Sequence, residues 1–268
     1  MRTCARDHST AAVASTCLCT GLLALGVLAR ADASLSAAPP SYDYVRVSAG
    51  SYPLGDARGR YDERPVVYVR LSSFELARTE VSQGEFARFL RATGYVPQGN
   101  FRLASPAGAD DLPARFVSWH DAREFTRWAG CRLPTEAEWE TAARSVFAAN
   151  SGAARLGPVN AQGSARERLL HLTDNVREWT ADWYDRYAYH GYAAAAAPRL
   201  DPRGPEDGAL PERRFIDTDN EAGNERSTRR VVRGASWAAT SEDQRRPSVR
   251  HAHPPDHDYD DVGFRCAR

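Results

Sequence analysis

The sequence contains no lysine, because all 35 of its basic residues are arginine. This absence excludes chemistry that needs a lysine amine, namely Schiff-base catalysis, pyridoxal-phosphate chemistry and phosphate-binding loops that carry a lysine. The 35 acidic residues balance the arginines, so the formal net charge is zero. A chain without excess charge has no overall field that attracts nucleic acid or an anionic membrane. We therefore expect neither of them as a partner.

The sequence also lacks an apolar run that is long enough for a comfortable membrane span. Its most apolar stretch, residues 11–29, follows a positively charged start and precedes small residues in the pattern of a signal-peptidase site. This pattern predicts a secretory signal peptide over residues 1–33 and a short linker over residues 34–41. We expect a periplasmic or secreted protein that has no membrane attachment after cleavage, and an uncleaved N-terminal anchor is the alternative.

Cysteine is scarce as well, since the chain has five and three of them lie in the predicted signal peptide. The remaining two are Cys131 and Cys266. Two cysteines in an oxidising compartment favour one disulfide, so we predict a bond between them, and two free buried thiols are the alternative. In the chain-entropy view, a disulfide that closes so long a loop contributes several kcal/mol to stability.

Alternating apolar residues predict two strand regions in the first third of the chain. They fall within residues 42–56 and residues 65–78. In the second region Val67, Val69 and Leu71 occupy every other position, so they share one face of the strand. We expect this face to be buried.

Helical periodicity predicts three helices, within residues 79–95, 117–130 and 132–144. Two of them carry capping boxes, formed by Ser82 with Glu85 and by Thr135 with Glu138. The second half of the chain is less regular, and residues 191–214 are typical of a long surface loop. Few helices, short strands and long loops together indicate an α+β domain.

Four stretches, in order along the chain, resemble one known family. They read RPVVYVRLSSFELARTEVSQGEFARFLRATGY, FVSWHDAREFTRWAGCRLPTEAEWETAAR, LTDNVREWTADWY, and RVVRGASW followed at a distance by DDVGFRCAR. Together they resemble the formylglycine-generating-enzyme, or sulfatase-modifying factor, family over residues 42–268. The resemblance implies one domain with a C-type-lectin-like α+β fold, in which helices flank small twisted sheets and much of the backbone forms irregular loops.

The resemblance also implies a pair of catalytic cysteines that this chain lacks. In formylglycine-generating members, two cysteines between the RGxSW strand and the GFR strand bind copper(I) and oxidise a cysteine of a sulfatase. Here no cysteine occurs between Gly234 and Arg265, and Ala239 and Gln244 stand near the expected positions. Copper(I) requires soft ligands, and neither side chain supplies one. We therefore expect a member without copper and without formylglycine formation.

A calcium site beside the NVREW stretch is a further implication of the resemblance. The candidate ligands are Glu178, His171 and Asp174. Glu178 matches a carboxylate ligand of the family, whereas His171 and Asp174 depart from its pattern. Calcium prefers oxygen ligands, so an imidazole weakens this set. The alternative is that Glu178 pairs with a nearby arginine.

The stretch RHAHPPDHDYDDVGF, residues 250–264, concentrates imidazoles and carboxylates that suit iron or another transition metal. The candidate metal ligands are His251, His253 and His257. The candidate catalytic residues are His251, His253 and Asp261. The resemblance to members in ergothioneine and pyoverdine biosynthesis implies a non-haem metal oxidase. The alternative is a polar surface loop in which Arg250 pairs with Asp256.

The same part of the chain is predicted to line a binding pocket. The candidate ligand-binding residues are Ser236, Trp237, Arg245, Arg246, Arg250 and Tyr259. Trp, Tyr and Arg are enriched at binding hot spots, and several arginines suit an anionic ligand or a peptide. The segment also resembles the variable segments that retroelement-diversified proteins of this fold display for binding.

These observations leave three functional hypotheses for a protein that we expect to be a monomer. The first is a periplasmic or secreted maturation, tailoring or accessory factor that binds a peptide, a protein or a small anionic ligand. The second is a periplasmic non-haem metal oxidase of the siderophore-tailoring type. If the protein is an enzyme, we therefore expect an oxidoreductase-type tailoring enzyme. The third is a C-type-lectin-like binding protein of the variable display type. A metal at the histidines would favour the oxidase.

Overall fold

The computed structural model of the protein describes residues 38–104, 108–146, 155–161, 168–205 and 228–268. Residues Pro39–Arg268 form one compact unit. The predicted signal peptide and the first half of the predicted linker, residues 34–37, lie outside the described residues. No helix in the described ranges combines the length and the apolar character that crossing a membrane requires.

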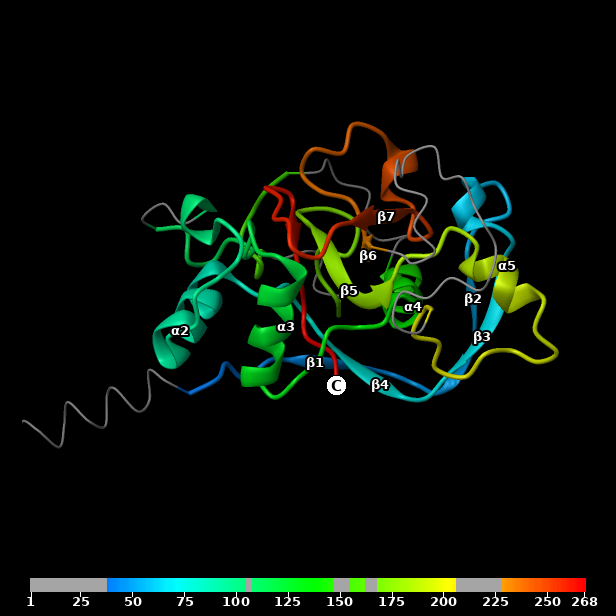
Figure 1. Cartoon of the computed structure of the whole chain (residues 1–268), viewed down its shortest axis with the longest axis horizontal. Coiled ribbons are helices and arrows are strands. Elements are labelled where there is room, and N and C mark those ends of the chain that lie inside the picture. The colour runs from blue at the N-terminus through cyan, green and yellow to red at the C-terminus, as the bar shows by residue number, and fades with distance from the viewer. Residues whose placement is uncertain (1–37, 105–107, 147–154, 162–167, 206–227) are drawn as a thin grey trace, which may run out of the picture. The chain divides into compact units, whose positions relative to one another are not determined.

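Four strands from the N-terminal third form two antiparallel pairs. They are β1 (Tyr44–Val47) with β4 (Phe74–Ala77), and β2 (Gly50–Leu54) with β3 (Val67–Leu71). Because β1 leads into β2 and β3 leads into β4, the two pairs follow each other as one long bent ribbon (Figure 1). The alternation predicted for the second strand region is confirmed, since Val67, Val69 and Leu71 are all buried.

A four-stranded sheet occupies the middle of the compact unit, in the order β7-β6-β5-β8. Its strands are β5 (Arg177–Trp183), β6 (Arg230–Arg233), β7 (Arg250–His253) and β8 (Val262–Gly263). Strand β6 is antiparallel to both β5 and β7, whereas β8 runs parallel to β5. Side chains alternate across a strand, so Arg230 and Val232 lie on one face of β6, and Val231 and Arg233 lie on the other.

Three helices begin where the sequence predicts them. They are α2 (Gln83–Thr93), α3 (Trp119–Trp128) and α4 (Glu136–Val146), whereas the short α5 (Ala188–Ala193) was not predicted. Both predicted capping boxes form, and the backbone N–H of Glu138 donates to Thr135 Oγ1 at 3.2 Å. Gly94 ends α2 in the left-handed conformation that glycine adopts without strain. The loop predicted over residues 191–214 instead begins inside α5, and its residues from 206 onward lie outside the described ranges.

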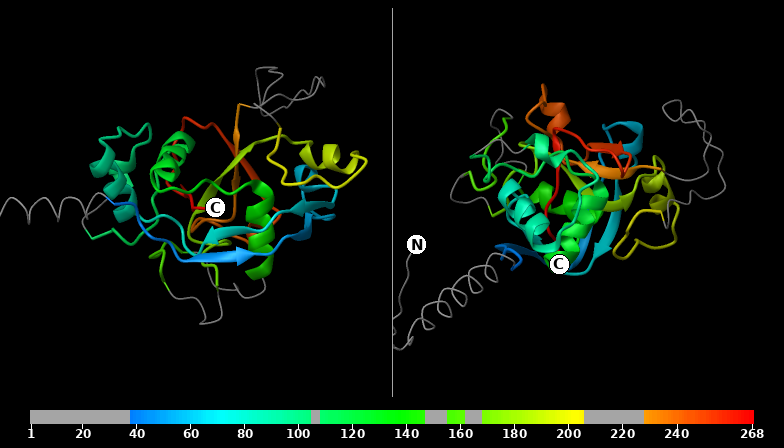
Figure 2. Two further views of the ribbon diagram at one scale, coloured as in Figure 1. Left: turned by 90° about the horizontal axis from the view of Figure 1, so that it is seen from below. Right: turned by 60° about the vertical axis from the view of Figure 1, so that its left-hand side comes forward.

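Helices α3 and α4 cover opposite faces of the central sheet, and both Figure 1 and Figure 2 show this arrangement. On the α3 side, an aromatic core joins Phe125 to Trp179 and Val232 of the sheet. On the α4 side, Trp139 packs in a second core with residues of the β2–β3 pair. The indole Nε1 of Trp119 donates to the carbonyl of Thr180 at 2.7 Å, which fixes α3 to β5.

The predicted disulfide between Cys131 and Cys266 is present. It joins the end of the α3 segment to the last residues of the chain, which lie between β4 and Arg132. There Leu76 and Arg132 each form an isolated bridge to Ala267. The C-terminal segment therefore ties the N-terminal ribbon to the aromatic core.

Candidate functional site beside strand β7

The segment that follows β6 is shaped by one glycine. Gly234 has a positive φ of 88°, and a Cβ at this position would approach the carbonyl of Leu172 and the ring of Trp139, each at 3.0 Å. Only glycine fits such a conformation and such a close approach. The chain then turns so that Ser236 is buried, while Trp237 keeps 37% of its surface exposed.

Asp261 is fixed by two neighbours that come from distant parts of the chain. Ser236 Oγ donates a hydrogen bond to Asp261 Oδ2 at 2.9 Å, and the guanidinium of Arg177 pairs with the same carboxylate. Of the predicted catalytic and ligand-binding residues, the structure therefore brings Asp261 and Ser236 together. Within the described residues no hydrogen bond joins Ser236 to a histidine, so its hydroxyl is not part of a serine–histidine pair.

Two further predicted residues, His251 and His253, project from the same face of β7. Their rings are parallel with centroids 6.5 Å apart, and the ring of Tyr259 lies 4.2 Å from that of His253. Burial and the nearby cation of Arg177 lower the pKa of His251 to about 3 and that of His253 to about 4. Both imidazoles are therefore neutral near pH 7. We call the group of Arg177, Ser236, His251, His253, Tyr259 and Asp261 the β7 site.

The structure does not bring the three predicted metal-binding histidines together. His257 is exposed in the turn after β7, and its backbone N–H donates to the carbonyl of Pro254. Among the described residues no group of three or more His, Cys, Asp or Glu side chains is placed to hold a metal ion. The Nε2 atoms of His251 and His253 are buried without a hydrogen-bond partner in the same ranges. The β7 site thus offers two imidazole donors but no third ligand.

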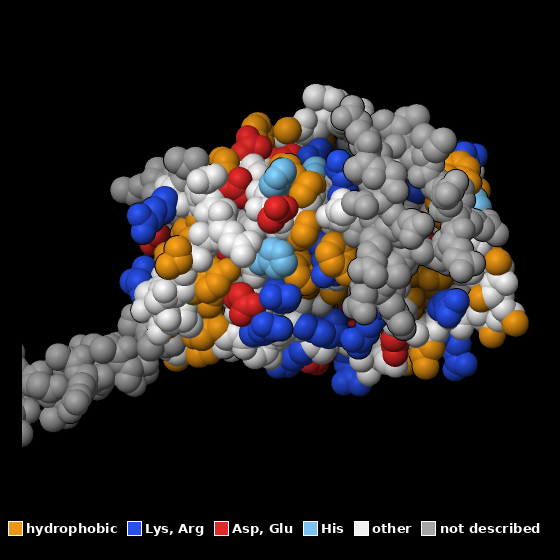
Figure 3. All heavy atoms as spheres, viewed as in Figure 1, with side chains coloured by type: hydrophobic (Ala, Val, Ile, Leu, Met, Phe, Trp, Pro, Cys, Tyr) orange, Lys and Arg blue, Asp and Glu red, His pale blue; other side chains and the backbone are white. Residues whose placement is uncertain are grey.

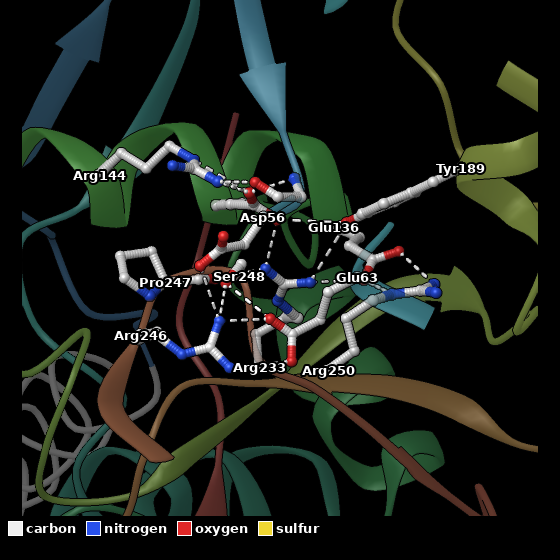
Figure 4. A network of polar contacts seen from close by, with 12 residues as sticks. Asp56, Glu63, Glu136, Arg144, Tyr189, Arg233, Arg246, Pro247, Ser248 and Arg250 are labelled. Carbon is white, nitrogen blue, oxygen red and sulfur yellow. Dashed lines mark hydrogen bonds and ion pairs between the residues drawn. The ribbon is translucent and has the colours of Figure 1, made fainter. Parts of the chain in front are cut away.

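Arg246 is engaged in ion pairs instead of facing an open pocket. Its guanidinium donates to the buried carboxylate of Glu63 at 2.6 Å and also to Asp56 (Figure 4). It donates to Asp243 as well. Ser248 Oγ donates to the same Glu63 carboxylate at 2.8 Å. Burial alone would raise the pKa of Glu63, but the hydrogen bonds from Arg246, Ser248 and Arg60 lower it to about 2.

Arg250 lies in the interior, which corrects its predicted place in a pocket wall. Its guanidinium binds both oxygens of Glu136, at 2.6 and 2.9 Å, and Figure 4 shows the two side chains turned toward each other. The suggested pair between Arg250 and Asp256 is therefore wrong. Glu136 also accepts from Arg233 at 2.7 Å, and Arg233 reaches Glu140 at 2.5 Å. The remaining predicted pocket residue, Arg245, is half-buried at the end of the 3₁₀ helix over Glu242–Arg245.

The candidate calcium ligands do not form a common site. Glu178 is fully buried and pairs with Arg265 at 2.6 Å, and it also accepts from Trp139 Nε1 at 2.9 Å. His171 instead contacts Asp174, with Nδ1 and Oδ1 separated by 2.9 Å. The structure thus supports the alternative that Glu178 is the partner of an arginine, and it leaves this carboxylate without a free oxygen for calcium.

Sequence reasoning missed the acids that neutralise the buried arginines. Glu136 lies in the first turn of α4, and its side chain is buried beneath the sheet. One signal was available, because Glu136 and Glu140 are four residues apart and share a helix face with the buried Trp139 and Ala143. Two acids on an apolar helix face indicate a cationic partner inside the fold.

The sequence matches the sulfatase-modifying factor enzyme 1-like domain, FGE-sulfatase, over residues 30–162 and 146–268. The chain belongs to this family. A formylglycine-generating enzyme of Streptomyces coelicolor is 29% identical over 300 aligned positions, which cover 83% of this chain and 88% of that protein. The family predicted from the four motif stretches is thereby confirmed.

Two solved structures share the fold of this family member. PvdO from Pseudomonas aeruginosa superimposes with a TM-score of 0.62 at 22% identity, covering 84% of this chain and 93% of that one. Treponema denticola variable protein 1 gives a TM-score of 0.59 at 21% identity, covering 84% and 94%. These likenesses confirm the predicted α+β, C-type-lectin-like fold with its small sheets.

Proposed function

We propose that the protein is a periplasmic or secreted maturation, tailoring or accessory factor of the FGE-sulfatase family that binds a peptide or protein partner without copper–cysteine chemistry. One observation carries this proposal. Both cysteines within the described ranges, Cys131 and Cys266, are joined in a disulfide, and the sequence between Gly234 and Arg265 contains none. The described part of the molecule therefore presents no free thiol.

The chemistry of formylglycine formation in relatives depends on the thiol group. A thiolate is both the nucleophile in thiol exchange and the soft ligand that copper(I) requires. The two residues that stand near the expected cysteines are an alanine, Ala239, and a glutamine, Gln244. The amide oxygen of Gln244 accepts a hydrogen bond from the backbone N–H of Thr240 at 2.7 Å, so it stabilises the turn. Neither position retains a group that could replace the cysteine.

The surface beside Asp261 supports a binding role. Trp237 is exposed over 37% of its surface, and its backbone is held by a hydrogen bond to the carbonyl of Asn175 at 2.8 Å. Next to it, Ser236 and Arg177 fix the carboxylate of Asp261. An exposed indole on a hydrogen-bonded backbone beside a fixed charge is typical of the residues that dominate protein–peptide recognition.

The direct test is an assay for the aldehyde product. The purified mature protein, loaded with copper(I), is incubated with a cysteine-containing sulfatase peptide, and the peptide mass is followed by mass spectrometry. The Streptomyces coelicolor relative serves as the positive control in the same buffer. We expect no aldehyde from the present protein, and conversion of the peptide by it would overturn the proposal.

The location is tested by expressing the full chain in a Gram-negative host. We expect the protein in the periplasm, with a mature N-terminus at Ser34 and the three cysteines of residues 1–33 removed. Intact mass measurement of the periplasmic fraction reports whether the protein is in the periplasm and where the signal peptide was cleaved. An uncleaved protein in the membrane fraction would instead establish the N-terminal anchor.

A metal oxidase is the second candidate function, and one observation favours it. The neutral imidazoles of His251 and His253 have Nε2 atoms without a partner in the described ranges, and a neutral imidazole is the form that binds a metal. Elemental analysis of the periplasmic protein tests whether these histidines bind a metal. The comparison is a variant with His251→Ala, His253→Ala and His257→Ala. Near-stoichiometric iron, zinc or copper that disappears in the variant would make the oxidase the better hypothesis.

A further inference from the structure

A recess lies beside the β7 site, between α3, the turn that joins β3 to β4, and residues 201–203. Its volume is about 460 Å³, which lies in the range of pockets that hold small molecules. Arginine dominates its charged lining, which consists of Arg123, Arg127, Arg132, Arg203, Arg230 and Arg268 with Glu138 and Asp201. We call it the arginine cleft. Figure 3 shows a row of basic side chains across the lower part of this face, near α3.

The acids of the cleft are already engaged. Glu138 binds Arg132 through both oxygens, each at 2.7 Å. Asp201 accepts from the backbone N–H and the hydroxyl of Ser72, each at 2.7 Å. Two other arginines of the lining pair with acids outside it, Arg127 with Glu124 and Arg268 with Glu75. Arg230 and Arg203 form no ion pair with any residue that the structure describes, so the cleft carries uncompensated positive charge.

Arg230 is held in a position that leaves donors available. Its guanidinium carbon lies 3.7 Å from the ring centre of Trp119 and 3.5 Å from that of Trp183, so the planar group stacks between two indoles. Nη1 donates to the carbonyl of Ala181 at 2.8 Å, whereas the buried Nε has no partner within the described residues. Burial lowers the pKa of Arg230 to about 10, so the group stays charged near pH 7.

A guanidinium that is fixed by stacking is preorganised to bind an anion. Its face is occupied by the two indoles, so only its edge can accept a partner, and that edge has the geometry for two parallel hydrogen bonds to an oxyanion. The Nε, which has no partner in the described ranges, is enclosed, so the donors of Arg230 that can face a ligand in the recess are those of Nη1 and Nη2, of which Nη1 also donates to Ala181. The half-exposed Arg123, whose guanidinium carbon lies 5.2 Å from the ring centre of Trp119, adds positive charge at the same indole.

We propose that the arginine cleft binds the oxyanion group of a small ligand, a sulfate, phosphate or carboxylate, with the edge of Arg230 as its anchor and Arg203 as a second cation. This proposal does not depend on the function proposed above, because none of the lining residues belongs to the β7 site. The cleft nevertheless lies next to that site, since Arg230 of β6 is paired in register with His253 of β7.

Isothermal titration calorimetry of the mature protein at low ionic strength tests this binding. Sodium sulfate, sodium phosphate and sodium citrate are titrated separately, and their order of affinity distinguishes a tetrahedral oxyanion from a carboxylate. We expect saturable binding of at least one probe with a single site. Arg230→Gln should weaken it by about tenfold or more, the loss expected for hydrogen bonds to a charged group. Arg230→Lys, which keeps the charge but not the two-pronged edge, should fall between the wild type and Arg230→Gln.

Two further variants separate a site from general attraction. Arg203→Gln should weaken binding without disturbing the fold, because Arg203 is exposed and has no ion pair within the described residues. Arg91→Gln, which removes one exposed charge from α2, is the matched control and should change the affinity by less than about twofold. Absence of saturable binding for all three probes would overturn the proposal. Equal losses in the Arg230, Arg203 and Arg91 variants would overturn it as well.

Discussion

The two faces of the central sheet hold their arginines in opposite ways. On the face toward α4, Arg233 and Arg250 are buried, and each is paired with a glutamate of that helix. On the face toward α3, aromatic rings and the disulfide form the core, and Arg230 lies between two indoles and forms no ion pair with an acid that the structure describes. A charge is tolerated inside a fold either by a counter-charge or by partial access to water, and the sheet shows both solutions.

Arg230 and Arg233 make this contrast within one strand. Burial alone lowers the pKa of each guanidinium. Around Arg233 the charges of Tyr189, Glu140 and Glu136 outweigh that effect and raise the pKa above the usual range of arginine. Around Arg230 the charge of Asp182 opposes burial only in part, and the pKa falls to about 10. The first arginine therefore stabilises the fold, and the second retains binding capacity.

The largest expected effect comes from breaking the paired face. Arg233→Met leaves Glu136 and Glu140 with less compensation in the interior, and we expect the free energy of unfolding to fall by about 3–5 kcal/mol. Urea unfolding followed by circular dichroism measures it. Arg268→Met removes an exposed pair with Glu75 and should cost only about 0–1 kcal/mol. If the two variants lost equal stability, burial would not distinguish the pairs.

Removal of the disulfide on the α3 side should have the next largest effect on stability. Cys131 and Cys266 are separated by 135 positions, and loss of the bond should lower the free energy of unfolding by about 2–5 kcal/mol. The Cys131→Ala/Cys266→Ala protein is compared with the wild type by urea unfolding without reductant. Reductant should destabilise the wild type and leave the double variant unchanged. A double variant as stable as the oxidised wild type would show that this face does not depend on the bond.

The pH dependence of the free energy of unfolding tests how Asp182 is held on the α4 face. Burial, together with the charge of Glu136, raises the pKa of this carboxyl to about 8. The neutral acid is therefore preferred in the fold, so the stability it supports is complete below the unfolded pKa of about 4 and is lost as the pH rises toward 8. Asp182→Asn should remove this loss between pH 4 and pH 8.

Asp182→Asn is measured by urea unfolding at several pH values, beside Asp243→Asn. Asp243 is 79% exposed at its side chain, so its variant should follow the wild-type dependence closely. We expect the gain of the Asp182 variant over wild type to increase with pH. A gain that is constant across the range would mean that the carboxyl titrates normally and that Glu136 does not influence it.

Arg230→Met is expected to have a smaller effect on stability than Arg233→Met or loss of the disulfide. Arg230→Met keeps an apolar stem between Trp119 and Trp183 and loses mainly the cation–π contacts, which are worth about 0.5–2 kcal/mol. Urea unfolding should therefore give this variant a clearly larger free energy of unfolding than Arg233→Met. A loss as large as that of the Arg233 variant would make Arg230 a structural residue and would remove the contrast between the two faces.

Local features were predictable because the interactions that create them are local. The capping box of Ser82 and Glu85 joins residues three positions apart, and the alternation of Val67, Val69 and Leu71 follows from the pleat of a strand. The disulfide was predictable for a different reason, since only two cysteines remained to pair outside the predicted signal peptide. The family followed from four motif stretches, which also implied the fold.

The candidate site was less predictable, because its residues are positioned by long-range contacts. Ser236 and Asp261 were both selected from the sequence, but nothing indicated that Arg177 would fix the same carboxylate. Arg250 was selected for its charge and belongs instead to the interior. His251 and His253 were expected to bind a metal with His257, but the turn after β7 places the third imidazole in solvent.

The sequence by itself determined the three longer helices and the buried face of β3, the family to which the chain belongs, and that no cysteine lies between Gly234 and Arg265. Only the tertiary structure decided which arginines are neutralised and which remain available. The physical reason is that all arginines are chemically alike, and a partner such as Glu136 lies 97 positions from Arg233. Whether a guanidinium meets a carboxylate or an indole depends on which face of the sheet it occupies and on the helix that covers that face.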